Sequence, residues 1–285
     1  MNRNTYENNP INKIIPIFLW IIASLFGSKI ILQIFLKTFT INNQLTLFSF
    51  HILLKPLKIK AAFLLNTFSE LIFFLLLLIG NLIFFKVKTK FFSKKLISAI
   101  LIILPTIIFL SGNLILAVKN LDKKNESLNQ ILIIILFVLV VGLTEEYGFR
   151  GLLLGKLLQA KNKNKFYLLI SVILQGLAFG LTHSINIFHQ SFSETITQLI
   201  YASAIGIIFG LVYIKTAFLT VTIIFHALID GLAFIASPQS IVKANNTEIP
   251  LQTTYFMLGI FLSIIIYAII IIFFSRSKNL NRLWR

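Results

Sequence analysis

The stretch that decides the fold is ILIIILFVLVVGLTEEYGFRGLLL, residues 131–154. Its first 13 residues, 131–143, are apolar or Gly, and a helix of that length is only about 20 Å long. The hydrocarbon core of a bilayer is about 30 Å thick, so a helix that crosses it has to continue through Glu145, Glu146 and Arg150. Two acids and one base are therefore expected inside a membrane span.

The composition of the whole chain agrees with a membrane protein. Of its 285 residues, 57% are hydrophobic and only 12% are charged, whereas soluble domains carry about 25% charged residues. The mean hydropathy is +0.91. These values exclude a soluble enzyme, a disordered scaffold and a secreted disulfide module. The chain has no cysteine, which also excludes thiolate zinc sites and a cysteine nucleophile.

The apolar runs predict an all-α, polytopic membrane helix bundle. Helices are expected and not barrel strands, because each run is long enough to cross a bilayer with its backbone hydrogen-bonded internally. The eight predicted spans are 14–36, 63–85, 97–118, 130–156, 166–188, 198–214, 216–236 and 254–274. The first is read as a retained span and not as a signal peptide, since no small-residue cleavage site follows it.

The spans are interpreted as parts of one integral membrane domain. Residues 1–120 are predicted to be N-terminal support spans, residues 121–240 the core that carries the chemistry, and residues 241–285 a C-terminal span with a tail. Small residues spaced four apart, as in Gly176/Gly180 and Ala202/Gly206, predict close helix packing within the core.

The net charge of +17 comes from 26 Lys and Arg against 9 Asp and Glu. The lysines lie between apolar runs, as in 86–95, where they attract anionic lipid headgroups; the lipid bilayer is thus an expected partner, and nucleic acid is not. Lys and Arg are more numerous in the segments on one side of the membrane than in those on the other. This bias predicts that both termini are cytoplasmic. The amino-acid usage is rich in Asn, Lys and Ile, which indicates a bacterial source. A bacterial cell membrane is therefore the predicted location.

The charged residues of the fourth predicted span divide into a pair and a single acid. Glu146 and Arg150 are four residues apart and are expected to pair on one helix face. Glu145 lies about 100° further round the helix, without a partner in its own span. Both acids could simply neutralise Arg150 and fix the packing, but a second, desolvated carboxylate is also suited to act as a general base.

Two histidines follow inside apolar spans. His183 lies at the end of Phe179–His183, and His226 shares a helix face with Asp230, four residues later. Each alone fits a hydrogen-bonded core residue. Together with Glu145 they are expected to surround one cavity, because ionisable groups at membrane depth need partners or water. His51 and His189 lie in connectors and receive no role.

This set of side chains is compatible with hydrolysis of a peptide bond. A carboxylate polarises a water molecule, and imidazoles stabilise an oxyanion. The same residues, Glu145, His183, His226 and Asp230, are also candidate ligands for a divalent metal such as zinc that activates the water. The HExxH spacing of zinc proteases and a GxSxG-type nucleophile are both missing.

Three motifs carry a family resemblance. Glu145–Gly151 resembles an EExxxR signature with its frequent Phe-Arg-Gly ending, Phe179–His183 resembles FxxxH, and His226–Asp230 resembles HxxxN/D, in that order. On these motifs the chain, from about 120–140 to 236, resembles the CAAX protease and bacteriocin-processing (CPBP) family of intramembrane proteases. That group is also called CAAX prenyl protease 2/lysostaphin resistance protein A-like.

The resemblance implies a role for each motif residue. Glu145 would activate the water, supported by Glu146, Arg150 and the motif's Phe179. His183 would be the second catalytic group, and His226 with Asp230 would bind the oxyanion or assist the water. CAAX-processing members usually carry Asn where this chain has Asp230, which favours a metal or a shared proton there. The departure also fits bacterial members linked to peptide maturation and bacteriocin self-immunity.

Three functions follow as hypotheses. The first is an intramembrane endopeptidase that acts near the end of a membrane-associated or prenylated peptide or protein. The second is a non-catalytic immunity protein that binds a bacteriocin or its receptor. The third is a proton- or metal-coupled transporter that uses the same residues as a relay; the inverted repeats typical of transporters are not visible in the sequence.

Overall fold

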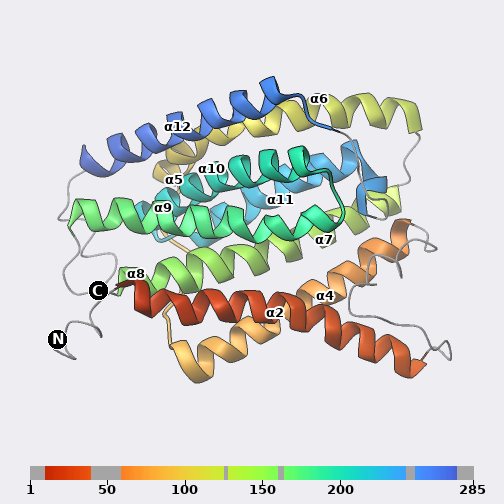
Figure 1. The fold of residues 1–285 in the computed structure, drawn as a ribbon, viewed down its shortest axis with the longest axis horizontal. Helices are drawn as coiled ribbons and strands as arrows, with labels where there is room; N and C mark the ends of the chain where they lie inside the picture. Colours follow the sequence, from red (N-terminus) through yellow and green to blue (C-terminus); the bar gives the residue numbers. More distant parts are fainter. Residues whose placement is uncertain (1–9, 40–58, 125–127, 160–163, 242–247, 275–285) are drawn as a thin grey trace.

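The computed structural model describes residues 10–39, 59–124, 128–159, 164–241 and 248–274. In these ranges the chain is a bundle of helices (Figure 1). Eight helical segments are long and apolar enough to cross a membrane: 14–36, 59–85, 96–119, 128–158, 165–188, 192–216, 219–236 and 251–273. The predicted all-α, multi-pass membrane architecture is therefore confirmed in the described part of the chain, and the protein is a multi-pass integral membrane protein.

Several spans are composites of α-helix with a short π or 3-10 segment. The elements are α2 (Pro10–Phe39), α4 (Ile59–Gly80), η1 (Asn81–Phe85), α5 (Leu96–Ile103), η2 (Leu104–Thr106), α6 (Ile107–Lys124), α7 (Leu128–Glu146), η3 (Tyr147–Leu154), α8 (Gly155–Leu158), α9 (Lys165–Thr182), η4 (His183–Phe188), α10 (Phe192–Thr216), α11 (Leu219–Ala236), η5 (Pro238–Ile241) and α12 (Leu251–Phe273).

The start of the sixth span and the winding at the end of the fifth differ from the prediction for local reasons. Helix α10 begins at Phe192 and not near residue 198, because the Ser191 hydroxyl accepts a hydrogen bond from the backbone N–H of Glu194 at 3.2 Å and caps a polar first turn. Helix α9 ends at Thr182, and the last part of the predicted span becomes the 3-10 segment η4, which starts at His183. A histidine predicted inside a helix therefore lies at the point where the helix changes its winding.

Helix α10 is the centre of the bundle. It is the most buried of the eight spans and packs against α9, α12 and α5. At the α9–α10 crossing, a Cβ atom added to Gly206 would lie 2.9 Å from the Cα of Gly176. The close approach predicted from the small residues is confirmed here. Helices α12 and α6 lie along one edge of the bundle and α2 and α4 along the other (Figure 1).

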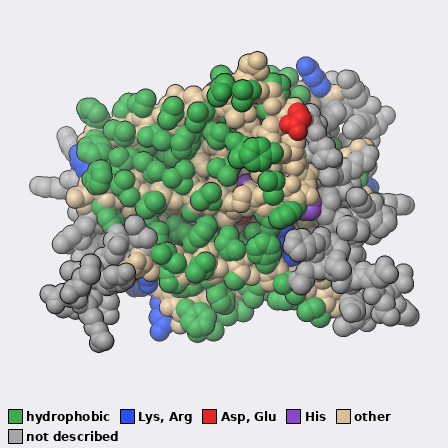
Figure 2. Space-filling view, viewed as in Figure 1, with side chains coloured by type: hydrophobic (Ala, Val, Ile, Leu, Met, Phe, Trp, Pro, Cys, Tyr) green, Lys and Arg blue, Asp and Glu red, His purple; other side chains and the backbone are tan. Residues whose placement is uncertain are grey.

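The outer surface is apolar, as expected for contact with lipid. Figure 2 shows a face covered mainly by hydrophobic side chains, with Lys and Arg side chains toward its periphery. Exposed Phe, Leu and Ile side chains are numerous on α2, α4, α6 and α12. A soluble protein rarely exposes apolar surface on this scale.

Candidate active site

The turn that carries the first motif is a π-helix. Helix α7 ends at Glu146, and the span continues as η3 from Tyr147 to Leu154. All eight residues of η3 are buried. Wide π turns inside α-helices occur frequently at functional sites. The span thus crosses the membrane continuously, as predicted, but its winding changes directly after the two glutamates.

Glu146 and Arg150 form the buried base of the site. Arg150 Nη1 donates to Glu146 Oε1 at 2.7 Å, and both side chains are 0% exposed. The Arg150 guanidinium also lies over the ring of Phe179, 4.4 Å from its centroid, and 5.3 Å from that of Phe209. The pairing predicted from the four-residue spacing is present. Phe179, predicted as a supporting residue, contacts the cation of this pair.

His226 joins both glutamates and Asp230. Its Nδ1 lies 2.9 Å from Glu146 Oε1, and its Nε2 lies 3.5 Å from Glu145 Oε2 and 3.3 Å from Asp230 Oδ2. Ionised carboxylates only accept hydrogen bonds, so this environment stabilises a doubly protonated, positively charged imidazole. Glu145 had no predicted partner in its own span; its partner comes from α11.

The two outer carboxylates remain accessible. The side chains of Glu145 and Asp230 are 24% and 31% exposed, whereas that of His226 is 7% exposed. Glu145 and Asp230 therefore keep contact with the surroundings of the helix bundle. Glu146 and Arg150 do not.

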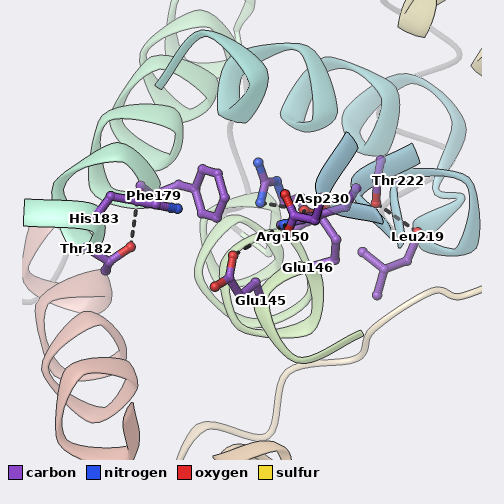
Figure 3. A network of polar contacts seen from close by, with 10 residues as sticks. Glu145, Glu146, Arg150, Phe179, Thr182, His183, Leu219, Thr222 and Asp230 are labelled. Atoms are coloured by element: carbon purple, nitrogen blue, oxygen red, sulfur yellow. Dashed lines mark hydrogen bonds and ion pairs between the residues drawn. The ribbon is translucent and has the colours of Figure 1, made fainter. Parts of the chain in front are cut away.

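His183 lies across the Phe179 ring from the carboxylates. In Figure 3 the Phe179 ring separates His183 from Glu146, Arg150 and Asp230. Its centroid lies 5.0 Å from that of His183 and 5.8 Å from that of His226, in edge-to-face geometry. Glu145 is still within electrostatic range of His183. The structure therefore brings Glu145 and Asp230 into contact with His226, and His183, the first residue of η4, lies on the other side of the Phe179 ring.

The backbone fixes the tautomer of His183. Its Nδ1 lies 3.1 Å from the carbonyl oxygen of Phe179, which also accepts the Thr182 hydroxyl at 2.6 Å. A carbonyl oxygen only accepts, so Nδ1 carries the hydrogen and donates it. In a neutral imidazole Nε2 is then the acceptor. This arrangement makes His183 Nε2 available to accept a proton or a hydrogen bond from water.

Gly142 allows α7 and α11 to come close enough for His226 to reach both glutamates. A Cβ atom at position 142 would lie 2.9 Å from the carbonyl oxygen of Ile223 and 3.5 Å from the Cβ of His226. The glycine lies one turn before Glu146 on the same span. The site therefore depends on a helix contact that a larger residue would widen.

Replacing Gly142 with Ala is expected to destabilise the protein by about 1–3 kcal/mol, the usual cost of overpacking. The matched control is Gly112→Ala on α6, where an added Cβ would meet nothing within 4 Å and where Ala favours the helix. Thermal unfolding midpoints in detergent compare the two variants. Equal midpoints would contradict a tight α7–α11 contact.

The sequence interpretation overlooked Glu70. This acid lies in α4, within the apolar run 63–85, and its Oε2 is buried without a hydrogen-bond partner among the residues that the structure describes. The Thr144 hydroxyl donates to the Glu70 carbonyl oxygen at 3.3 Å, and the Glu70 carboxyl is within electrostatic range of Glu145, Lys29 and His226. An acid in the middle of an apolar run was the signal that could have identified it.

Three of the four predicted metal ligands, Glu145, His226 and Asp230, contact one another in the structure. Among the residues that the structure describes, no group of three or more His, Asp and Glu side chains is placed to hold a metal ion. Both nitrogens of His226 are turned toward carboxylates, and a protonated nitrogen does not ligate a metal. A divalent metal held by Glu145, His183, His226 and Asp230 stays a prediction.

Taken together, the fold and the site define a polytopic membrane protein with a buried Glu–Arg pair beneath an accessible Glu–His–Asp cluster.

Residues 127–232 match the model of a family described as type II CAAX prenyl endopeptidase, Rce1-like. The membrane-embedded CAAX protease MroQ of Staphylococcus aureus (strain USA300) is 32% identical over 130 residues, which are 44% of this chain and 49% of that protein. No solved structure matches the chain.

The three motifs lie on the matched spans, in the order of the resemblance. These matches support the CPBP/CAAX protease family for residues 127–232. The chain spans about half the length of the curated relative that it matches.

Proposed function

We propose that the protein is an intramembrane endopeptidase in which Glu145 activates a water molecule to hydrolyse a peptide bond. The observation that carries this proposal is that the two neighbouring glutamates have different environments. Glu146 is fully buried and paired with Arg150, whereas Glu145 is partly exposed and contacts His226. The Glu145 side chain is 24% exposed and can contact a water molecule. The matched family model supports the same class of reaction.

The reaction balances with the residues present. Glu145 takes a proton from the water, whose oxygen attacks the peptide carbonyl and forms a tetrahedral oxyanion. The charged imidazole of His226, held by Asp230 and Glu146, stabilises that negative charge. Glu145 then gives its proton to the leaving nitrogen as the C–N bond breaks. His183 Nε2 orients the water by accepting its second hydrogen.

The proposed substrate is a membrane-associated or prenylated peptide or protein, because the accessible carboxylates lie on spans that are otherwise surrounded by apolar side chains. We place the protein in a bacterial cell membrane with both termini in the cytoplasm. The lysine-rich segment 86–95 supports this orientation: Lys95 Nζ donates to the Lys215 carbonyl oxygen, and Lys156 Nζ donates to that of Phe85. Cationic side chains thus gather at one end of the bundle, as at a cytoplasmic face.

Purified protein in phosphatidylcholine vesicles tests the proposed activity. The probe is a peptide that contains S-farnesyl-cysteine followed by three residues, and mass spectrometry locates the cut. The expected result is one cleavage site close to the modified cysteine. A peptide derived from a bacteriocin precursor is tested in the same way. If both peptides stayed intact, the result would contradict the proposed endopeptidase activity. Metal content and activity after chelation, with and without added Zn²⁺, test the metal-assisted form of the same reaction.

Replacing His183 with Ala is expected to lower kcat by about 100-fold, because the water would no longer be oriented for attack and a small misplacement of a reactant costs about that much. The matched control is His189→Ala, a histidine at the end of the same 3-10 segment that lies outside the cluster of carboxylates. Initial cleavage rates in vesicles compare the variants at equal protein abundance. Similar losses in both variants would show that the effect comes from the segment and not from His183.

A further inference from the structure

Two further charged residues, on helices α2 and α4, lie at the depth of the active site. The hydroxyls of Ser28 on α2 and Ser69 on α4 lie 3.4 Å apart, and the next residues along these helices are Lys29 and Glu70. The Thr144 hydroxyl contacts the Glu70 carbonyl oxygen at 3.3 Å, directly before Glu145. These contacts bring Lys29 and Glu70 to the level of the proposed base, although both lie outside the matched residues 127–232.

Lys29 interacts electrostatically with groups on two neighbouring segments. It is half-buried in an apolar span, and Glu70 is within electrostatic range of it. Burial, together with the nearby Lys29 charge, lowers the pKa of His189, at the far end of η4. Lys29 is therefore within electrostatic range of Glu70 on α4 and of His189, which follows η4.

The ammonium of Lys29 differs from the other cations of the site in its contacts with acidic side chains. Arg150 is hydrogen-bonded to Glu146, and His226 lies within 3.5 Å of three carboxylates. Lys29 has no hydrogen bond or close ion pair with a described residue beyond its longer-range attraction to Glu70. A cation at membrane depth that lacks a close partner is costly, and such residues mark functional sites. An anionic ligand would complete its environment.

A peptide substrate carries one fixed anion, the carboxylate at its C-terminal end. The carboxylates of Glu145, Glu146 and Asp230 would repel that group, so it needs a cation at the same depth but to one side of them. We infer that Lys29 binds the C-terminal carboxylate of the substrate, with Glu70 holding the ammonium in place, and that this contact selects peptides cut close to their end. The inference rests on the proposed function.

A binding measurement tests Lys29 separately from catalysis. All variants carry Glu145→Gln, so that the probe stays intact, and are placed in phosphatidylcholine vesicles. The probe is a fluorescent peptide with S-farnesyl-cysteine followed by three residues, prepared as the free acid and as the C-terminal amide. We expect the free acid to bind about 10- to 100-fold more tightly than the amide, which is what one charge-assisted hydrogen bond is worth.

Substitutions of Lys29 then identify the group responsible for this preference. Lys29→Met should bind acid and amide equally, whereas Lys29→Arg should keep the preference. Lys60→Met, a lysine at the start of α4, is the matched control and should behave like the parent. In the chain with Glu145 intact, Lys29→Met should raise KM for the free acid and leave kcat for the amide unchanged.

Several results would overturn the assignment. Equal or absent binding of acid and amide by the parent would do so, as would a preference that survives in Lys29→Met. An anionic lipid headgroup offers similar oxygen chemistry. If Lys29→Met responds to replacing phosphatidylcholine with phosphatidylglycerol but not to amidation of the peptide, Lys29 binds lipid. Loss of cleavage with an intact acid-over-amide preference would instead contradict only the proposed hydrolysis.

Discussion

Replacing Glu145 with Gln is expected to lower the cleavage rate by about 10²- to 10⁴-fold, the range found when a general acid–base group is removed. The amide has nearly the shape of the carboxyl group but cannot take a proton from water at neutral pH. The Glu146–Arg150 pair and the contact between His226 and Asp230 do not involve this side chain. The loss should therefore appear in kcat, with normal protein abundance and unfolding midpoint.

The matched control for this experiment is Glu248→Gln, which changes an acid that binds the Ser193 hydroxyl away from the site. Its cleavage rate should equal that of the parent protein. If Glu145→Gln still cleaved at the parental rate, Glu145 would not be the base. If neither protein cleaved any peptide but both protected cells against a bacteriocin, the non-catalytic immunity hypothesis would replace the protease.

The parts of the structure that depend on local sequence could be predicted. Apolar runs of membrane length define helices because lipid offers the backbone no hydrogen bonds, and the observed spans follow these runs closely. The four-residue spacings placed Glu146 beside Arg150 and His226 beside Asp230, since both pairs lie on one helix face. The location of the charged motif inside the fourth span was also predicted, because the apolar run before it is too short to cross a bilayer.

Contacts between helices were beyond what these patterns contain. A span that is apolar on every side gives no preferred face, so the sequence did not show that His226 would touch both Glu145 and Glu146. The π winding of η3 depends on how its buried residues pack against neighbouring helices. Glu70 and Lys29 went unassigned because each is a single charge, and their relation to Glu145 appears only when α2 and α4 pack beside α7.

Replacing Arg150 with Met is expected to lower the free energy of unfolding by about 3–5 kcal/mol, the usual effect of removing one partner of a buried ion pair. Both charges of the pair are fully buried, so Glu146 would lose its closest cation where water cannot reach it. Stacking of the guanidinium on Phe179 and Phe209 would be lost as well. Thermal and denaturant unfolding in detergent measure the change, with Lys119→Met, at an exposed position of α6, as the control.

The double variant Arg150→Met/Glu146→Gln separates the charge from the shape of this site. It removes both members of the pair, so no unpaired anion remains, and much of the lost stability should return. Cleavage should nevertheless stay low, because His226 Nδ1 would lose the carboxylate that lies 2.9 Å away and maintains its positive charge. If the double variant cleaved at the parental rate, the buried pair would serve folding alone, and Asp230 with Glu145 would suffice to hold His226 in its catalytic state.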